Sequence, residues 1–425
     1  MHPKTLLDTA TELLRRVLRF EHPADEVVSR FFREHRGLGQ RERATLAETA
    51  YAVLRRKPLY EHLAASGTGA WERRLAVLGF GAPREFLVPA LGDAERAWLD
   101  ACDAVALTEL PPACRHNLPL WLAERLAAQV GDEFDALAAA LLQSAPLDLR
   151  VNVFKQKVAP VRAELAQVAI ETVATPYSPW GLRVAGKPAL QKLDAFTRGA
   201  IEVQDEGSQL LALLLDARRG EMVADFCAGA GGKTLALGSA MRNTGRLYAF
   251  DVSAHRLAQL APRLARSGLG NVHPVAIAHE RDERIKRLAG KLDRVLVDAP
   301  CSGLGTLRRH PDLKWRQSPA GVPALAASQQ AILASSARLV KPGGRLVYAT
   351  CSLLTEENEA VAQAFGGAHG EFVAQDVGAL LHALKVPRAE TLCSGAPGAP
   401  GPYLRLWPHR HGTDGFFAAV WQRRA

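Results

Sequence analysis

The stretch from Glu221 to Thr234, Glu-Met-Val-Ala-Asp-Phe-Cys-Ala-Gly-Ala-Gly-Gly-Lys-Thr, constrains the fold more than any other part of this sequence. A short apolar strand is predicted over Met222 to Phe226, a helix is predicted to begin at Lys233, and glycines fill the turn between them. Glycine lacks a Cβ atom, so the backbone can bend sharply there and approach a ligand, while the helix N-terminus offers unpaired N–H groups. The pattern predicts an α/β fold with a polar or anionic ligand at the turn.

The next strand indicates what kind of ligand this is. Leu247 to Phe250 reads as a second strand and ends in Asp251, where a nucleotide-type α/β fold places a carboxylate for ribose hydroxyls. The turn also carries Lys-Thr after its glycines, as a phosphate loop does, but Cys227 stands where that loop requires its first glycine. A nucleoside is therefore favoured and a nucleoside triphosphate is disfavoured.

Strand and helix patterns continue to alternate beyond Asp251, which predicts a parallel sheet with its ligand at the C-terminal strand ends. Two closing strands, over 403–407 and 416–421, are expected to be antiparallel at the sheet edge, and 377–402 is expected to be a surface excursion. The inner elements are predicted as strands over 272–277, 294–297 and 345–349, and as helices over 253–266, 281–288 and 323–339.

Upstream of the glycine turn the pattern indicates two further regions. Apolar residues recur at helical spacing from Leu6 to about Leu142, and period-two alternation begins at Asp148. We therefore expect three domains: an all-α domain over 1–145, a small α+β module over 146–205, and an α/β Rossmann-like domain over 206–425. Four arginines surround the turn at Gly37 to Gly39 and form a candidate RNA contact, namely Arg33, Arg36, Arg41 and Arg43.

Charge and cysteine usage limit the possible partners. The formal net charge of +9 over 425 residues is typical of a nucleic-acid-binding protein, and no apolar run is long enough to span a bilayer. The N-terminus lacks the pattern of an export signal, so we expect a cytoplasmic protein, and we expect it to be a monomer. The six cysteines form no Cys-x-x-Cys pair, which argues against a metal site and against a disulfide framework.

Two cysteines stand directly after predicted strands. Cys301 lies in Asp-Ala-Pro-Cys-Ser-Gly, and Cys351 lies in Ala-Thr-Cys-Ser. Both positions fall on the ligand side of the predicted sheet, close to helix N-termini that favour a negative charge. A thiol placed there can ionise, and the thiolate is a nucleophile, whereas most other cysteines are small buried hydrophobes. We read Cys102, Cys114 and Cys393 as buried residues of this second kind.

Taken together, the motifs resemble one family. They are residues 227–234 and 298–303, the Ala-Thr-Cys-Ser of 349–352, and Arg309-His310-Pro311-Asp312 with Trp315. This combination resembles the RsmB/NOP/Sun family of S-adenosylmethionine-dependent RNA cytosine-5 methyltransferases. The N-terminal helices resemble the NusB-type RNA-binding domain of its bacterial RsmB branch. The resemblance spans the chain and implies a class I methyltransferase domain, S-adenosylmethionine as cofactor, and small-subunit (16S) ribosomal RNA as substrate.

The resemblance also assigns roles to residues. Carbon 5 of cytosine is a poor nucleophile, so a thiolate must first attack carbon 6, and the resemblance gives this role to Cys351. Cys301 is implied to assist loss of the carbon 5 proton and release of the enzyme. Asp298 is expected to face the cytosine edge and the donor, with Lys233 near both. The residues expected to bind the donor are Cys227, Ala228, Gly229, Ala230, Gly231, Gly232, Lys233, Asp251 and Asp298.

Two positions depart from the family pattern. Gly229-Ala230 replaces the usual Ala-Pro, so no proline fixes φ in the turn, although donor binding is expected to survive. The third strand of the family normally ends in Asp near the adenine amine, whereas this chain has His279, followed by Glu280 and Asp282. A neutral imidazole nitrogen or a backbone carbonyl could each accept that hydrogen bond, and the adenine contact is open between them.

Three other functions compete with this interpretation. A non-catalytic RNA-binding or assembly factor is disfavoured because loss of function would erase the two thiols first. A DNA cytosine methyltransferase needs only one Pro-Cys site, and Cys351 at a second strand end argues against it. A transfer-RNA cytosine-5 methyltransferase remains an alternative, and the position of the target cytosine cannot be read from the sequence.

Overall fold

The structure, a computed structural model, describes residues 1–396 and 399–425 and forms two compact units. One unit comprises residues 1–144 together with 306–319. The other comprises residues 145–305 and 320–425, and contains both the small module and the large sheet. The division is therefore not simply sequential, because a segment from the second half of the chain belongs to the first unit.

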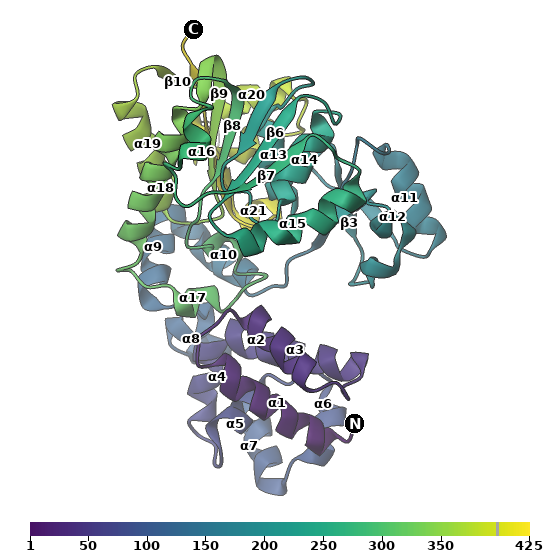
Figure 1. Ribbon diagram of the computed structural model, residues 1–425. Coiled ribbons are helices and arrows are strands. Elements are labelled where there is room, and N and C mark those ends of the chain that lie inside the picture. The colour runs from purple at the N-terminus through teal and green to yellow at the C-terminus, as the bar shows by residue number, and fades with distance from the viewer. Residues whose placement is uncertain (397–398) are drawn as a thin grey trace. The chain divides into compact units, whose positions relative to one another are not determined.

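The first unit is helical, as the apolar spacing predicts (Figure 1). Its core is formed by one face of each amphipathic helix, with Leu7, Leu13 and Leu14 of α1 and Leu46 and Leu54 of α3 fully buried. The helices are α1 (Pro3–Val17), α2 (Ala24–Glu34), α3 (Gln40–Arg55), α4 (Lys57–Ala64), α5 (Trp71–Leu78), α6 (Arg84–Leu87), α7 (Asp93–Asp103), α8 (Pro112–His116), α9 (Leu120–Val130) and α10 (Phe134–Leu141).

The segment 306–319, which includes α17 (Leu313–Arg316), is fastened into this helical unit by buried polar contacts. Lys314 Nζ donates to the carbonyl oxygens of Arg55 at 2.8 Å and Asn117 at 2.7 Å. The indole of Trp315 donates to the carbonyl of Leu54 at 2.7 Å, and Asp312 accepts from the backbone N–H of Ala24 at 3.1 Å. Burial lowers the pKa of Lys314 well below its usual value. The chain that follows the Cys301 loop is thus an integral part of the helical unit.

The small module is a four-stranded antiparallel sheet in the order β2-β3-β1-β4, made of β1 (Leu147–Val151), β2 (Thr172–Ala174), β3 (Gly181–Val184) and β4 (Ile201–Val203). Its helices are α11 (Val158–Gln167) and α12 (Asp194–Thr197). One sheet face packs on these helices through Leu149, Val151 and Leu182. The other face is polar but buried, since Asn152 bonds Ser239 and the carbonyl of Ser267 in the adjoining large domain.

The large sheet has the order β11-β12-β13-β9-β8-β5-β6-β7, with β10 paired to β13. Strands β7, β6, β5, β8 and β9 are parallel, and β13, β12 and β11 extend the sheet in antiparallel pairing, as predicted for the closing strands. The strands are β5 (Met222–Asp225), β6 (Arg246–Asp251), β7 (Val272–Ala276), β8 (Leu292–Asp298), β9 (Val340–Thr350), β10 (Phe372–Ala374), β11 (Cys393–Ala396), β12 (Ala399–Leu406) and β13 (Phe416–Arg423).

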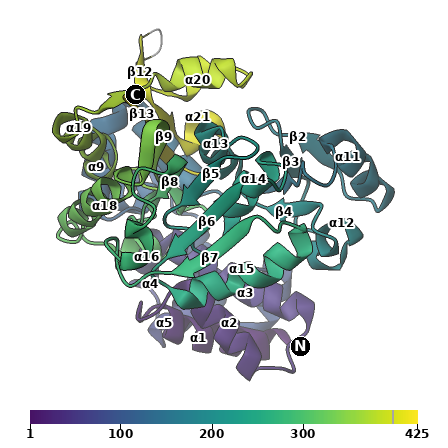
Figure 2. The ribbon, with the colours of Figure 1, turned by 45° about the horizontal axis from the view of Figure 1, so that its top comes forward.

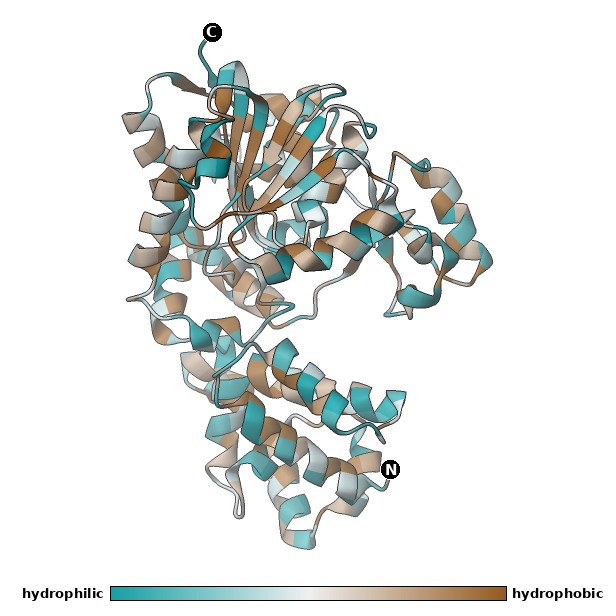
Figure 3. Cartoon of the chain, viewed as in Figure 1, coloured by the Kyte–Doolittle hydropathy of each residue, from teal (hydrophilic) through white to brown (hydrophobic). Residues whose placement is uncertain are grey.

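Helices cover both faces of this sheet (Figure 2). On one face lie α13 (Glu206–Leu215), α14 (Gly232–Ala240), α15 (Ala254–Ser267) and α20 (Val377–Ala383), and on the other lie α16 (Glu283–Lys286), α18 (Val322–Ala337) and α19 (Glu359–Ala368). A sheet covered on both faces requires apolar strands, and hydrophobic residues indeed follow its central strands in Figure 3.

Several predicted elements differ in extent. The strand predicted over 345–349 begins at Val340, and the helix predicted over 281–288 shrinks to the single turn of α16. The excursion predicted over 377–402 contains α20, β11 and the start of β12, while residues 397 and 398 lie outside the described part of the chain. The short edge strands β2 and β10 carry too few alternating residues to be predicted from period alone.

Candidate active site

A cavity of about 600 Å³ lies where β5, β6, β8 and β9 end. Five of the predicted site residues line it: Cys227, Asp251, Asp298, Cys301 and Cys351. The cavity is also lined by His279 and Glu280, which follow the third strand of the sheet in sequence, and by Phe226, Val252, Arg256, Ile277, Ala278, Ala299, Pro300, Ser328 and Ile332. No local sequence pattern pointed to Val252, Arg256, Ser328 or Ile332. Parallel strands bring their C-terminal ends to one edge of the sheet, so residues far apart in sequence meet there.

The glycine turn forms one end of this region and requires its glycines. Gly231 has φ of +81° as the N-cap of α14, and a Cβ atom there would lie 2.2 Å from a methyl carbon of Leu260. Gly229 has φ of +56° and donates its N–H to Asp251 Oδ2 at 2.7 Å. The other carboxylate oxygen of Asp251 accepts from Ser253 N at 2.8 Å. The turn and the predicted ribose-binding carboxylate are thus fixed to each other directly.

Two arginines hold the carbonyl groups of the same turn. Arg263 Nη1 donates to Ala230 O at 2.6 Å, and its Nη2 lies 3.1 Å from Glu202 of the small module. Arg150, also from the small module, donates to Gly232 O at 2.7 Å. Burial lowers the pKa of Arg150 to about 10, which leaves its guanidinium charged at neutral pH. These contacts explain how the turn keeps its shape although Ala230 replaces the proline of the family pattern.

Asp225, at the end of β5, supplies a second buried carboxylate beside the turn. Its Oδ2 accepts from Thr234 Oγ1 at 2.7 Å, while Oδ1 is buried and has no hydrogen-bond partner among the described residues. Burial raises the pKa of Asp225 to about 7. A buried acceptor without a partner costs free energy unless a ligand or water satisfies it, so this oxygen marks a place for a hydrogen-bond donor.

The two thiols face each other across the C-terminal ends of β8 and β9. Cys301 Sγ and Cys351 Sγ lie 3.4 Å apart, and no disulfide joins them. The loop that carries Cys301 is also tied to the Cys351 loop through the backbone, because Gly305 N donates to Cys351 O at 2.8 Å. The hydrogen bond to Cys351, burial, and the charges of Cys351 and Glu357 raise the pKa of Cys301 well above its usual value. Cys301 therefore retains its proton when one of the two thiols ionises.

Lys233 joins the glycine turn to the thiols. Its Nζ lies 2.7 Å from Asp298 Oδ2. Burial alone lowers the pKa of the Lys233 ammonium, but the charge and hydrogen bond of Asp298 and the charge of Cys351 raise it overall. Lys233 thus brings a positive charge to both Asp298 and Cys351.

The remaining predicted residues either line the cavity or form the glycine turn beside it. Cys227 lines the cavity, but burial and the charges of Asp298, Asp225 and Asp251 raise its pKa, so it stays a thiol. Ala228 anchors the turn by donating to Phe250 O at 2.8 Å. Ala228 and the residues from Gly229 to Lys233 do not line the cavity. Gly229 and Lys233 instead contact two residues that do, Asp251 and Asp298.

The structure distinguishes His279 from Asp282, two residues that follow the third strand in sequence. Asp282 caps α16 and accepts from Ala278 N at 2.8 Å and Arg284 N at 2.9 Å, and these bonds lower its pKa. Its oxygens therefore serve the local backbone, and Asp282 does not line the cavity. His279 does line it. Of the three residues named after the third strand, His279 and Glu280 line the cavity and Asp282 does not, and the choice between the imidazole and a backbone carbonyl stays open.

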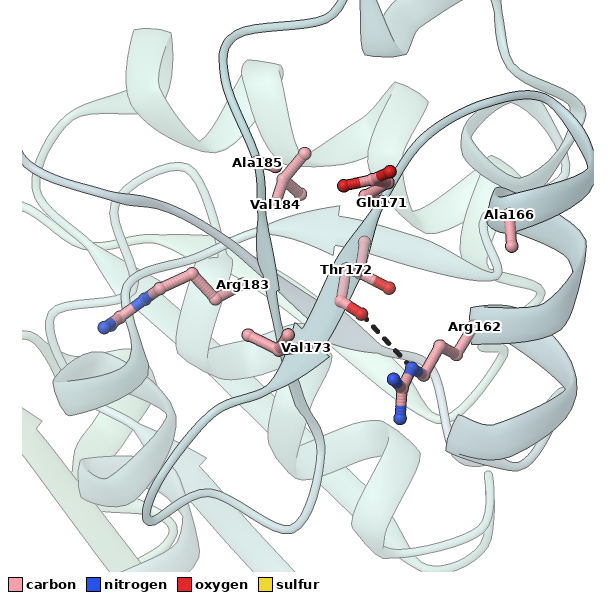
Figure 4. Close-up of a pocket in the computed structure, with 8 residues that line it drawn as sticks. All are labelled: Arg162, Ala166, Glu171, Thr172, Val173, Arg183, Val184 and Ala185. Atoms are coloured by element: carbon pink, nitrogen blue, oxygen red, sulfur yellow. Dashed lines mark hydrogen bonds between the residues drawn. The ribbon is translucent and has the colours of Figure 1, made fainter.

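A second pocket, of about 610 Å³, lies in the small module between α11, β2 and β3 (Figure 4). Arg162 of α11 donates to Thr172 O of β2 at 3.1 Å (Figure 4). The pocket is lined by Glu171, Thr172, two arginines and apolar side chains, and contains no thiol and no carboxylate pair. Its residues carry none of the predicted chemistry, so the cavity at the strand ends is the better candidate.

The described residues contain neither a cluster of metal-ligating side chains nor a membrane-spanning helix. Within residues 1–396 and 399–425, no group of three or more His, Cys, Asp or Glu side chains is arranged to hold a metal ion. In the same ranges, no helix has the length and apolar character needed to cross a bilayer.

The strand order and the position of the cavity define a Rossmann-like methyltransferase domain, and comparison with known proteins specifies it further. The model of the family described as 16S rRNA methyltransferase RsmB/F matches residues 212–422, and the model of its ferredoxin-like domain matches residues 118–191. The chain belongs to this RsmB/F family of ribosomal RNA methyltransferases.

Individual relatives agree with this assignment. The probable ribosomal RNA small subunit methyltransferase B of Bacillus subtilis is 30% identical over 80% of this chain and 74% of its own length. The corresponding protein of Synechocystis sp. is 37% identical over 72% of this chain, and the match spans 66% of that protein, just under two thirds. A methyltransferase homologue from Pyrococcus horikoshii has a solved structure with 28% identity and a TM-score of 0.63, covering 74% of this chain and 100% of the other.

Proposed function

We propose that this protein methylates carbon 5 of a cytosine in small-subunit (16S) ribosomal RNA, with S-adenosylmethionine as methyl donor and a covalent cysteine–cytosine intermediate. The observation that carries the proposal is the pair of thiols at 3.4 Å in a cavity that also contains Asp251 and Asp298. A methyltransferase acting on an oxygen or an exocyclic nitrogen has no need of a thiolate nucleophile, because its substrate atom already carries a lone pair.

The residues present fit the proposed donor. Asp251 offers carboxylate oxygens for two ribose hydroxyls, Ile277 and Ile332 offer apolar surface for a ring, and Asp225 Oδ1 offers an acceptor without a partner among the described residues. Bound S-adenosylmethionine supplies an electrophilic methyl group on a sulfonium. The turn of Gly229 and Gly231 allows the backbone to approach such a ligand closely.

In the proposed mechanism Cys351 is the nucleophile. Its thiolate, which interacts with the positive charge of Lys233, forms a bond to carbon 6 of the cytosine, and the electron pair of the 5,6 double bond makes carbon 5 nucleophilic. Asp298 hydrogen-bonds the exocyclic amine and steadies the ring while carbon 5 accepts the methyl group. Carbon 5 then still carries its original proton, and that proton must leave before the carbon–sulfur bond can break.

Cys301 is the proposed base for this last step. Its pKa is raised by the hydrogen bond to Cys351, by burial, and by the charges of Cys351 and Glu357. When the sulfur of Cys351 is bonded to carbon, the charge of Cys351 is gone, so Cys301 can release its proton to solvent and then accept the proton of carbon 5. The electrons of the C–H bond restore the double bond, and the thiolate of Cys351 leaves. The two thiols therefore act in sequence.

RNA binding by the helical unit, as a NusB-type domain, is part of the proposal. Of the four arginines predicted at the turn before α3, Arg33, Arg36 and Arg41 are exposed, while Arg43 donates to Leu38 O at 2.9 Å and stacks on Phe32. Exposed arginines can neutralise phosphates. Replacing the three exposed ones by Glu should weaken RNA binding and reduce its salt dependence, with Arg43→Gln as a local control.

Nucleoside analysis tests the proposed reaction. Purified protein is incubated with 16S ribosomal RNA from a deletion strain and with donor labelled in its methyl group, and the digested RNA is separated into nucleosides. We expect label in 5-methylcytidine at a single position that bisulfite sequencing also shows to be unmodified in the deletion strain. Label in another nucleoside, or in transfer RNA alone, would contradict the proposed substrate.

A further inference from the structure

A buried carboxylate lies between the two cysteine loops. Glu357 follows β9, its side chain is fully buried, and it accepts hydrogen bonds from both loops at once. Ser302 donates to it twice, from N at 2.8 Å and from Oγ at 2.5 Å, and Ser352 Oγ donates at 2.5 Å. The two serine hydroxyls also lie 3.1 Å apart. Each serine directly follows one of the two cysteines, so Glu357 sets the separation of the residues beside both thiols.

A second buried side chain strengthens the same connection. Gln329 of α18 donates from Nε2 to Glu357 Oε1 at 2.9 Å and to Pro300 O at 3.0 Å. Tyr348 of β9 donates to the backbone carbonyl of Glu357 at 2.6 Å and contacts Gln329 Oε1 at 3.2 Å. The residues on either side of Cys301 are therefore held by one network, which also reaches back into the strand that ends at Cys351.

The charge of this carboxylate acts on the Cys301 thiol. All the donors to Glu357 described above are neutral, and the described residues show no ion pair to it. The charge of Glu357 is among the causes that raise the pKa of Cys301. The other titratable groups around Cys301 are Cys351 and Tyr348, and Lys233 with Asp298 lies on the side of Cys351. A buried charge without a counter-ion interacts strongly with its neighbours.

We propose that Glu357 is the positioning residue of the thiol pair: it clamps the two cysteine loops together through Ser302 and Ser352 and holds its carboxylate beside the Cys301 loop. The proposal rests on the proposed function for its catalytic meaning, but not for its geometry. A carboxylate that merely stabilised the fold would not change the reactivity of Cys301 when its charge alone is removed.

The test compares Glu357→Gln, Glu357→Ala and the exposed control Glu283→Gln in the full-length protein. Alkylation by iodoacetamide is followed across pH without RNA or donor, and mass spectrometry resolves the peptides of Cys301 and Cys351. Glu357→Gln keeps the size and the hydrogen-bonding reach of the side chain but removes the charge, so the midpoint for Cys301 should fall by about one pH unit while that of Cys351 moves less. The control should leave both midpoints unchanged.

Glu357→Ala also removes the clamp. Both thiols should then be alkylated faster, and kcat for methylation should fall by about 100-fold with little change in KM for the donor, since small misplacements of reacting groups have effects of this size. Glu357→Gln should retain a higher kcat than Glu357→Ala, because glutamine can still hydrogen-bond both cysteine loops.

Wild-type alkylation profiles at both thiols in Glu357→Gln would overturn the proposal, and this variant decides the matter even if Glu357→Ala fails to fold. If the wild-type protein methylates no cytosine while the midpoint of Cys301 still shifts, the proposed function fails and the clamp stands.

Discussion

The two sides of the cavity are built differently, although both lie at the ends of parallel strands. On the donor side, the carboxylate at the end of β6 is held by backbone N–H groups: Asp251 accepts from Gly229 and Ser253. On the thiol side, at β8 and β9, the loops are held by side chains around Glu357. Lys233 connects the two sides through Asp298. A backbone-held site presents a fixed shape to a ligand, whereas a side-chain network can adjust the charge of reacting groups.

This difference separates binding from chemistry. Substitutions on the donor side should change the affinity for S-adenosylmethionine, and substitutions on the thiol side should change the rate of methyl transfer at saturating donor. A variant that changes both the donor affinity and the rate of methyl transfer would show that the substituted residue couples the two sides.

Lys233 should show the largest effect because it serves both sides. Lys233→Met removes the positive charge that interacts with Cys351 and leaves Asp298 without its ion pair. We expect kcat to fall by about 10²- to 10³-fold, the range for loss of one preorganised charged group. Single-turnover methylation with saturating donor measures it, and Lys341→Met, on an exposed ion pair far along β9, is the control. An unchanged kcat would remove Lys233 from the chemistry.

Asp251 should show the next largest effect, confined to the donor side. Loss of hydrogen bonds between a carboxylate and the ribose in Asp251→Ala should weaken donor binding by about 10- to 100-fold. Calorimetric titration gives the affinity. Ser253→Ala removes only the N-cap hydroxyl of α15 and serves as the control for damage to the local backbone. If Asp251→Ala binds donor as the wild-type protein does, Asp251 is not a ligand.

Arg263 tests whether side chains from beyond the turn support donor binding. Arg263→Ala removes the bond to Ala230 O and the link to Glu202, and we expect about 5- to 10-fold weaker donor binding, equivalent to one hydrogen bond. Adding Ala230→Pro, which fixes φ in the turn, should restore part of the affinity. Gln259→Ala, exposed on the same helix, is the control. Thiol alkylation that changed as much as donor affinity would contradict the separation of the two sides.

Asp225 should have the smallest effect on methylation but a clear effect on stability. Its folded pKa of about 7 lies above the ordinary value of 3.8, so ionisation opposes folding, and its contribution is complete below pH 3.8 and lost as pH rises through about 7. Asp225→Asn should therefore be more stable than the wild-type protein at pH 8 but not at pH 4. The difference should be a few kcal/mol at most, from about 1.4 kcal/mol per pKa unit.

Urea unfolding at both pH values, without donor, measures this difference. Equal pH dependence of the two proteins would show that Asp225 ionises in the folded state as it does in water.

Local sequence patterns were sufficient to predict the main residues on both sides of the cavity. The glycine turn, Asp251, Cys301 and Cys351 each directly follow a predicted strand, so each could be recognised from its own strand and the turn after it. Period-two and helical spacing likewise predicted the parallel sheet and its antiparallel edge, which the structure confirms. The roles of these site residues remain predictions.

The supporting side chains could not be predicted in the same way. Arg150 and Arg263 reach the turn from a different module and a later helix, so no local spacing connects them. Glu357 stands among Glu356 and Glu359, and only the packing shows which of the three is fully buried. Residues 306–319 were counted with the catalytic region because they follow its motif, whereas their buried partners are Leu54, Arg55 and Asn117.

The central claim is that Cys351 forms the bond to carbon 6 and Cys301 acts after methyl transfer. Denaturing electrophoresis of each alanine variant with labelled RNA and donor tests it most directly. Cys301→Ala should still attack and methylate but release poorly, so a retarded protein–RNA band is expected, whereas Cys351→Ala should give no band and no methylation. The reverse pattern would exchange the two roles, and wild-type activity in both variants, without a band from either, would contradict the thiol mechanism.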